Sequence, residues 1–189
     1  RAYPLLDVMK NVIGPSLNTE NKTDLQATFP VKKFIVPVEN SALQKYNVVT
    51  PTDSTYSQIL IELPEHKNFI TLDQLTILNI IAANGWQRPI YFTSPYGELG
   101  FGQYLRKDGL TYRLVPVKNS FPQQNWVVER RMGGASIRDN NTDVMYNNLM
   151  TKFSSGGAQN RGVYFDEENR RHLLSIRPVF GEAAGNMAD

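Results

Sequence analysis

The sequence contains no cysteine among its 189 residues. This absence excludes disulfide bonds, thiolate catalysis, iron–sulfur clusters and zinc sites built from cysteine. Histidine is scarce as well, because the chain has only 2, His66 and His172. They stand far apart and outside metal-ligand spacing, so each is interpreted as a surface or partly buried residue, and we expect no metal site.

Long apolar runs and a large net charge are also absent. The best apolar run, "LTILNIIAA" at 75–83, is far shorter than the roughly 20 residues that a bilayer-spanning helix requires. The formal net charge is +2, and the basic pairs Arg130-Arg131 and Arg170-Arg171 are short and scattered, unlike the clustered stripe of a polyanion-binding face. We therefore expect no nucleic-acid partner and no membrane span in this stretch. Its abrupt start, "RAYPLLDVMK", is interpreted as part of a longer protein.

What is present is the composition of a globular protein. Hydrophobic residues make up 41% and charged residues 20%, which is ordinary for one compact domain with a core. Thr71 with Gln74 three residues later predicts a capping box at the start of a helix over about 71–84, and Gly85 stands where helices commonly end. This helix is apolar on nearly all sides, which predicts a place in the middle of the fold. We expect strands near 33–38, 57–63, 89–94 and 110–117.

Further helices are expected within 100–109, at 142–153 and at 166–177, the last of them bent or stopped by Pro178. Helices and strands that alternate through short links are typical of crossover units on a parallel sheet. We therefore predict an α/β fold, with a small mixed, mostly parallel sheet flanked by helices and a helical C-terminal third. The chain divides into an N-terminal helix and loop segment at 1–28, an α/β domain at 29–140, and a helical C-terminal segment at 141–189 that packs on it.

The stretch "GWQRPIYFTSPYGELGFGQYL" at 85–105 has the order strand, glycine-rich loop, helix that many nucleotide-binding folds use. Its glycines, Gly97, Gly100 and Gly102, read G-x-x-G-x-G, which reverses the order of the dinucleotide fingerprint. The acidic residue that binds the ribose and the lysine of a P-loop are both missing. The loop is therefore interpreted as a tight turn, and a nucleotide or sugar-phosphate site at 94–102 remains the alternative.

Aromatic residues gather in the same stretch. They could line a platform on which a sugar ring stacks, or they could only pack around the strand ends. The other chemistry is sparse: "ELPEH" at 62–66 is interpreted as a solvated turn, and no nucleophile elbow is present. The sequence thus nominates no catalytic residue and no cofactor. The candidate ligand-binding residues are Trp86, Arg88, Tyr91, Tyr96, Gly97, Gly100 and Tyr104.

Several blocks resemble a known family. "FPVKKFIVPV", "NGWQRPIYFTS", "GFGQYLRKDGLTYRLVPVK" and "MYNNLMTKFSSGGAQNRGVYFDEENRRHLLSIRPVFGEAA" are similar to the soluble C-terminal region of domain of unknown function 2723, a family of bacterial multi-spanning membrane proteins common in the Bacteroidota. The resemblance covers about residues 29–184. Family members look like membrane glycosyltransferases related to protein O-mannosyltransferases, which take a sugar from a lipid-phosphate donor.

The resemblance implies a location and partners. It places the chain on the periplasmic side of the inner membrane, anchored by an upstream transmembrane segment of the same protein. In similar proteins the last helix continues into tetratricopeptide-like repeats, from which Pro178 departs. The catalytic acid of the family lies in a segment that this stretch does not include, so no catalytic residue is carried over. "DST" at 53–55 resembles the O-glycosylation sequon of these bacteria and makes Ser54 a candidate modification site.

Three hypotheses of function follow. The first is an extracytoplasmic accessory domain of a membrane-embedded glycosyltransferase, which is not catalytic alone and binds an acceptor polypeptide, a glycan or a partner. The second is a stand-alone enzyme that binds a nucleotide or sugar phosphate through the loop at 94–102. The third is a structural module that docks the membrane part to the downstream helical repeats.

Overall fold

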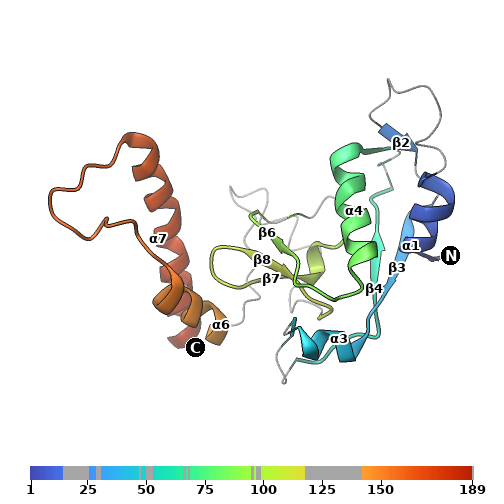
Figure 1. Ribbon diagram of the computed structural model, residues 1–189, viewed down its shortest axis with the longest axis horizontal. Helices are drawn as coiled ribbons and strands as arrows, with labels where there is room; N and C mark the ends of the chain where they lie inside the picture. The colour runs from blue at the N-terminus through green and yellow to red at the C-terminus, as the bar shows by residue number, and fades with distance from the viewer. Residues whose placement is uncertain are drawn as a thin grey trace.

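The computed structural model describes residues 1–14, 26–28, 31–46, 48–49, 53–65, 67, 69–94, 96, 99–117 and 142–188. Figure 1 shows them as two parts. The body, residues 1–117, carries the strands and several helices. The C-terminal helical segment, residues 142–188, lies at the opposite end of the molecule from the N-terminus. The interpretations of His66, Gly97 and the Arg130-Arg131 pair fall outside the described residues.

The central sheet of the body has the order β1-β3-β4, with β1 at Tyr3–Pro4, β3 at Lys33–Pro37 and β4 at Gln58–Glu62. β1 runs parallel to β3, and β3 runs antiparallel to β4. Because successive strand residues face opposite sides, alternate residues of β3 and β4 form one apolar face. The fully or nearly buried residues on that face are Phe34, Val36, Ile59 and Ile61.

Helix α4, Leu72–Asn84, covers this sheet with one face (Figure 1). Its start has the expected capping box between Thr71 and Gln74, and its C-cap, Gly85, has φ +56°. Burial is one-sided, however, because Leu72 and Ile80 remain 49% and 51% exposed. The prediction that this helix lies in the middle of the fold is therefore wrong: α4 is a surface helix that keeps apolar side chains on its outer face. Three of its leucine and isoleucine side chains are buried: Leu75, Leu78 and Ile81.

Shorter elements complete the body. Helix α1, Leu5–Val8, continues into a π-helical turn, η1, at Met9–Ile13, and contributes Leu5 and Ile13 to the core. Helix α3, Asn40–Lys45, was not among the helices expected from the sequence. Strand β2, Gln26–Thr28, pairs antiparallel with β5, Phe69–Thr71.

A third sheet has the order β6-β8-β7, with β6 at Tyr91–Phe92, β7 at Leu105–Lys107 and β8 at Tyr112–Leu114. Both of its pairings are antiparallel. Among the described strands only β1 and β3 pair in parallel, so the expected mostly parallel arrangement is wrong. The short link between β7 and β8 allows a hairpin but is too short for the crossover that parallel neighbours need. The mixed sheets flanked by helices, and the helical C-terminal third, are confirmed.

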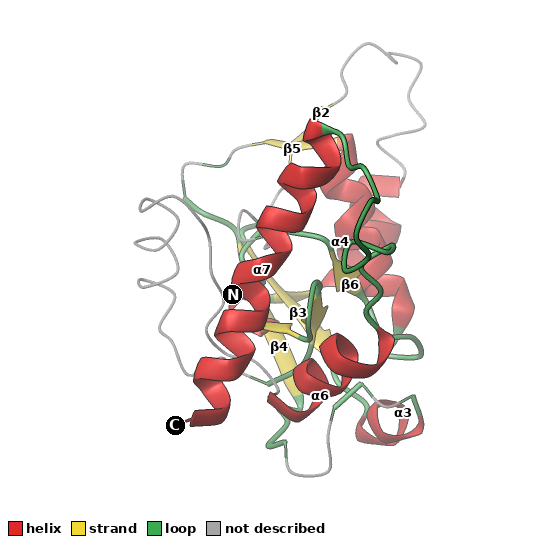
Figure 2. Cartoon of the chain, turned by 90° about the vertical axis from the view of Figure 1, so that its left-hand side faces the viewer, coloured by secondary structure: helices red, strands yellow, loops and turns green. Residues whose placement is uncertain are grey.

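The C-terminal helical segment contains α6, Thr142–Asn147, which continues into the π-helical turn η3, Asn148–Lys152, and α7, Glu167–Ala188. Figure 2 shows α6 beside the C-terminal half of α7. Pro178 lies inside α7 and does not stop it, so that one of the two expected outcomes is wrong. The residue is exposed, and water can bind the carbonyl group that loses its helical partner. This segment has a small hydrophobic cluster of its own, separate from the core of the body. Its members are Met145, Leu149, Val179, Phe180 and Ala183.

Candidate functional site

The described part of the glycine-rich segment, residues 99–104, lies along the outer edge of β4. Leu60 pairs with Ile35 of β3 but turns its N–H and C=O away from that strand. The N–H donates a hydrogen bond to the Tyr104 hydroxyl at 3.0 Å, and the C=O accepts one from the Gln103 amide at 3.4 Å. The segment therefore supplies partners to an edge strand that would otherwise leave buried backbone groups unpaired.

Gly100 explains why glycine is required in this segment. Its φ is +77°, and a Cβ placed on it would lie 1.9 Å from the Glu62 carbonyl oxygen. The helix expected within 100–109 is absent: a single 3-10 turn, η2, at Gly102–Tyr104 leads directly into β7. No α-helix therefore begins at Gly100. The free backbone N–H groups of a helix N-terminus, which bind phosphate in many proteins, are not formed there.

Three of the candidate aromatic rings belong to the core. Trp86 is 6% exposed, and its indole N–H donates to the Pro37 carbonyl at 2.8 Å. Tyr104 is equally buried, and burial raises the pKa of its phenol. Tyr96 is half-buried and stacks at 5.8 Å, centroid to centroid, on Phe101. The structure brings these rings into one hydrophobic cluster and does not assemble them into an exposed platform.

The remaining candidates are exposed but separate in role. Arg88 is exposed, and its main-chain N–H donates to the side chain of Asn84, the last residue of α4, at 3.1 Å. Tyr91 is 46% exposed, and its hydroxyl accepts a hydrogen bond from Arg113 Nε at 3.0 Å. The Arg113 guanidinium also lies 5.0 Å from the centre of the Tyr91 ring. Ser54 is exposed in the loop before β4.

A buried charge network, which the sequence analysis missed, lies beneath Tyr91. Arg106 donates to Asp53 at 2.8 Å, and Arg113 Nε lies 2.8 Å from a carboxylate oxygen of Asp108. The Asp108 side chain is only 1% exposed. Burial raises the pKa of Asp108, while the charges of Arg113 and Arg106 partly offset that rise. Two cations and two anions in one buried cluster are mutually neutralising, so the network holds the loop at Asp53 against the β7–β8 hairpin.

The network is not fully hydrogen-bonded. Within the described residues, Arg106 Nε and Nη2 and both carboxylate oxygens of Asp108 have no well-aligned hydrogen-bond partner. The Asp108 carboxylate is therefore held by proximity to its arginines, whereas Asp53 accepts a directed hydrogen bond from Arg106. A dipeptide could have revealed the hairpin that carries them, because Asp-Gly is a strong signal for a hairpin turn and stands here at Asp108-Gly109.

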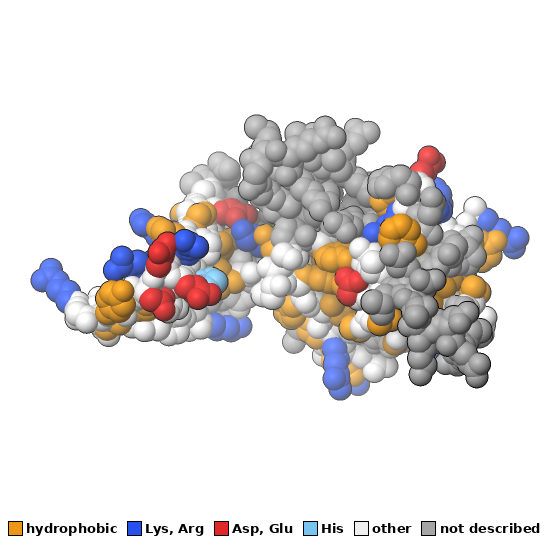
Figure 3. Space-filling model, turned by 90° about the horizontal axis from the view of Figure 1, so that it is seen from above, with side chains coloured by type: hydrophobic (Ala, Val, Ile, Leu, Met, Phe, Trp, Pro, Cys, Tyr) orange, Lys and Arg blue, Asp and Glu red, His pale blue; other side chains and the backbone are white. Residues whose placement is uncertain are grey.

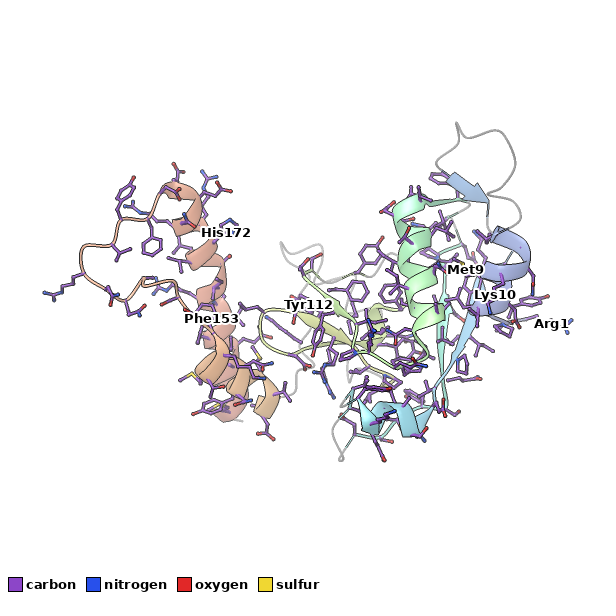
Figure 4. The ribbon with its side chains drawn as sticks, viewed as in Figure 1. Arg1, Met9, Lys10, Tyr112, Phe153 and His172 are labelled. Atoms are coloured by element: carbon purple, nitrogen blue, oxygen red, sulfur yellow. The ribbon has the colours of Figure 1, made fainter. Side chains whose placement is uncertain are left out.

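The same hairpin meets the C-terminal helical segment. Lys107 forms an ion pair with Glu182 of α7, and the Asn148 side chain donates to the Asp108 carbonyl at 2.9 Å. We call this region the joint. Figure 4 shows Tyr112 on the hairpin side of the joint and Phe153 on the helical side. An open pocket of about 320 Å³ lies between the hairpin and the helical segment.

The surface of the helical segment carries charges of both signs. Figure 3 shows acidic and basic side chains close together at this end of the molecule. Arg171 pairs with Glu167 at 2.5 Å, and His172 lies 3.9 Å from Glu168. Within the described part of the chain, no group of three or more acidic or histidine side chains could hold a metal ion. No helix in that same part has the length and apolarity to cross a bilayer.

Comparison with known proteins identifies the body. The family described as TMEM260-associated domain 2 matches residues 3–132, which is more than half of the chain. No curated protein and no solved structure matches the chain. The match is consistent with an accessory domain of a larger membrane protein. On the extent of this match, the chain belongs to the family of TMEM260-associated domain 2.

Proposed function

We propose that the chain is an extracytoplasmic accessory domain of a membrane-embedded glycosyltransferase similar to protein O-mannosyltransferases. It is not catalytic alone and binds the glycan or the acceptor polypeptide. The match of residues 3–132 to TMEM260-associated domain 2 carries this proposal. The sequence blocks that resemble domain of unknown function 2723 support the link to a glycosyltransferase on the periplasmic side of the membrane.

The pairing of the buried carboxylates with arginines supports a non-catalytic role. Within the described residues of the body, Asp53 and Asp108 are the carboxylates of the largely buried cluster, and each faces an arginine at 2.8 Å. Carboxylates paired in this way fix the fold and are poorly placed to exchange protons with a substrate. The partners in the intact protein are then an upstream transmembrane segment and downstream helical repeats.

Sugar transfer in membranes tests the proposal. Membranes that contain the intact protein, or the same protein with this domain removed, are given a labelled lipid-phosphate sugar and an acceptor protein. Removal should lower transfer to the acceptor at least tenfold while the membrane part still binds the lipid donor. Unchanged transfer without the domain, or sugar transfer by the purified 189-residue chain alone, would contradict the proposal.

The docking hypothesis has one observation in its favour. The C-terminal helical segment has its own hydrophobic cluster and contacts the body through the polar groups Lys107, Glu182 and Asn148. A segment held in this way could couple the body to helices beyond it. If the domain only docks, its removal should disturb assembly of the intact protein, and a glycan should not bind the isolated chain. By contrast, the geometry at Gly100 gives the nucleotide-enzyme alternative no support.

A further inference from the structure

The pocket at the joint has walls from both parts of the protein. Leu110 and Thr111, in the turn of the β7–β8 hairpin, form one wall. The other wall comes from η3 and the residue that follows it, and includes Asn148, Lys152 and Phe153. Ligand sites occur preferentially where two separately packed units meet, because such a boundary leaves a concave surface that neither core fills. The two hydrophobic clusters of this chain are separate, so the joint is a boundary of this kind.

The size of the pocket limits the ligand. Pockets for small ligands range over roughly 300–1,000 Å³. A volume of about 320 Å³ is at the lower end of that range and fits one ring, not a dinucleotide or a long oligosaccharide. The pocket is also open to solvent on one side, so a ring at the end of a longer chain can enter it.

The charges around the pocket argue against an anionic ligand. Among the described residues, Lys152 is the one cation in its lining, and its ammonium group already donates to the Asn148 side chain at 2.9 Å. Asp108 belongs to the same lining, but its buried carboxylate is already balanced by Arg113 and Arg106, so it adds no attraction for an anion. In addition, the pocket lies at the C-terminal end of the continuous helical run 142–152, where the helix dipole is negative. A phosphate would meet unfavourable electrostatics at this position.

The lining instead combines a ring, an aliphatic side chain and uncharged polar groups. Phe153 and Leu110 offer apolar surface, and Thr111 and Ser154 offer hydroxyl groups. The amide of Asn148 is held in one orientation, because its nitrogen donates to the Asp108 carbonyl and its oxygen accepts from Lys152. Sugar rings have an apolar C–H face and an edge of hydroxyl groups, which is the chemistry that such a lining complements.

We propose that the pocket between the β7–β8 hairpin and η3 binds one neutral sugar unit of a glycan. This proposal rests on the proposed function, because it names the site at which the domain holds its glycan. The site is then at the joint and away from the aromatic stretch at 85–105. A bound sugar touches both walls, so binding also fixes the angle between the body and the C-terminal helical segment.

A titration of the 189-residue chain with methyl glycosides tests the site. The probes are the methyl glycosides of mannose, glucose, galactose and N-acetylglucosamine, followed by amide chemical shifts in nuclear magnetic resonance spectra. At least one probe should shift the amides of Thr111 and Asn148 with saturation. Thr111→Val, which keeps the shape of the side chain, and Phe153→Leu, which keeps it apolar, should each weaken that binding at least fivefold.

Two controls keep the test independent of folding. Met150→Ala, at a residue of η3 that is 60% exposed and outside the lining, should leave the affinity unchanged. Inorganic phosphate at the same concentration should not compete. Shifts confined to Tyr91 and its neighbours, or no saturable shift with any glycoside, would overturn the proposal.

The outcome is separable from that of the transfer experiment. If removal of the domain abolishes transfer but no glycoside binds at the joint, the accessory role stands and this site is wrong. If a glycoside binds at the joint but transfer survives removal of the domain, the site stands and the role in transfer is wrong.

Discussion

Gly100 lies so close to the backbone of Glu62 that a single additional carbon would fall 1.9 Å from the Glu62 carbonyl oxygen. Glu62 is two residues beyond Leu60 on β4, so its backbone groups face the same outer edge. The outer edge of β4 is thus contacted along its length by Gly100, Gln103 and Tyr104. The glycine is needed for this close approach.

The first prediction concerns Gly100→Ala. The methyl group must displace backbone and also takes a positive φ, so we expect a loss of roughly 3 kcal/mol or more in the free energy of unfolding. Gly85→Ala is the matched control, because Gly85 also has a positive φ but a Cβ added to it would meet nothing within 4 Å. That control should lose only about 1 kcal/mol. Urea denaturation followed by circular dichroism measures both, and equal losses would refute the close-contact explanation.

The second prediction concerns Tyr104→Phe. The substitution keeps the buried ring but leaves the Leu60 N–H without its partner, which should cost about 1–3 kcal/mol in unfolding free energy. Tyr112→Phe is the control, because Tyr112 is half-buried and its hydroxyl makes no hydrogen bond within the described residues. We expect less than about 0.5 kcal/mol there. A Tyr104→Phe variant as stable as the wild type would show that water or another group satisfies Leu60.

The third prediction is a pH dependence at Asp108. Burial raises its folded-state pKa above the ordinary 3.8, so the folded protein binds the proton more readily than the unfolded chain. The stability of the wild type relative to Asp108→Asn should therefore rise as the pH falls through the folded-state pKa toward 3.8, and should be constant above that window. Denaturation of both proteins between pH 7 and about pH 4 measures the difference. A difference that shrinks on acidification would mean that Arg106 and Arg113 outweigh burial.

The fourth prediction tests the joint directly and uses the absence of native cysteine. A Cβ at position 109 would lie 3.5 Å from the Asn148 Cβ, which is within the range for a disulfide. The double variant Gly109→Cys, Asn148→Cys should form an intramolecular disulfide under mild oxidation, even though the positive φ at 109 costs about 1–3 kcal/mol. Mass spectrometry of the oxidised chain detects it. Gly85→Cys with Asn148→Cys should form none, and failure of the first pair alongside the second would contradict the contact between hairpin and η3.

Helix α4 shows what the sequence could predict. Its start depends on Thr71 and Gln74 and its end on Gly85, all of which act within a few residues, and these signals located both ends correctly. The strand near 57–63 followed from the local alternation of apolar and polar residues, and the strand near 33–38 was also located correctly. Its exposed face could not be predicted, because Leu72 and Ile80 have the same apolar character as the buried residues beside them.

The buried charges show what the sequence could not provide. Arg106 and Arg113, expected in a helix and a strand respectively, have the charge of solvent-facing residues when only their neighbours in the sequence are considered. They can be buried because Asp108 and Asp53 accompany them, and Asp53 is 53 positions from Arg106 along the chain. The fate of the aromatic rings was equally hidden, since Trp86 and Tyr104 suit a sugar platform and a core alike until their polar atoms are seen bonded to backbone.

The contacts that Gly100, Gln103 and Tyr104 make along β4 also have a consequence for solubility. An uncovered strand edge presents free N–H and C=O groups to which a strand of another molecule can add, and such addition propagates into aggregates. Tyr104 and Gln103 occupy those groups at Leu60, and Gly100 closes the next position, so a foreign strand cannot extend the sheet past β4. The glycine-rich segment that resembles a phosphate loop in sequence thereby protects this edge of the sheet from intermolecular β-pairing.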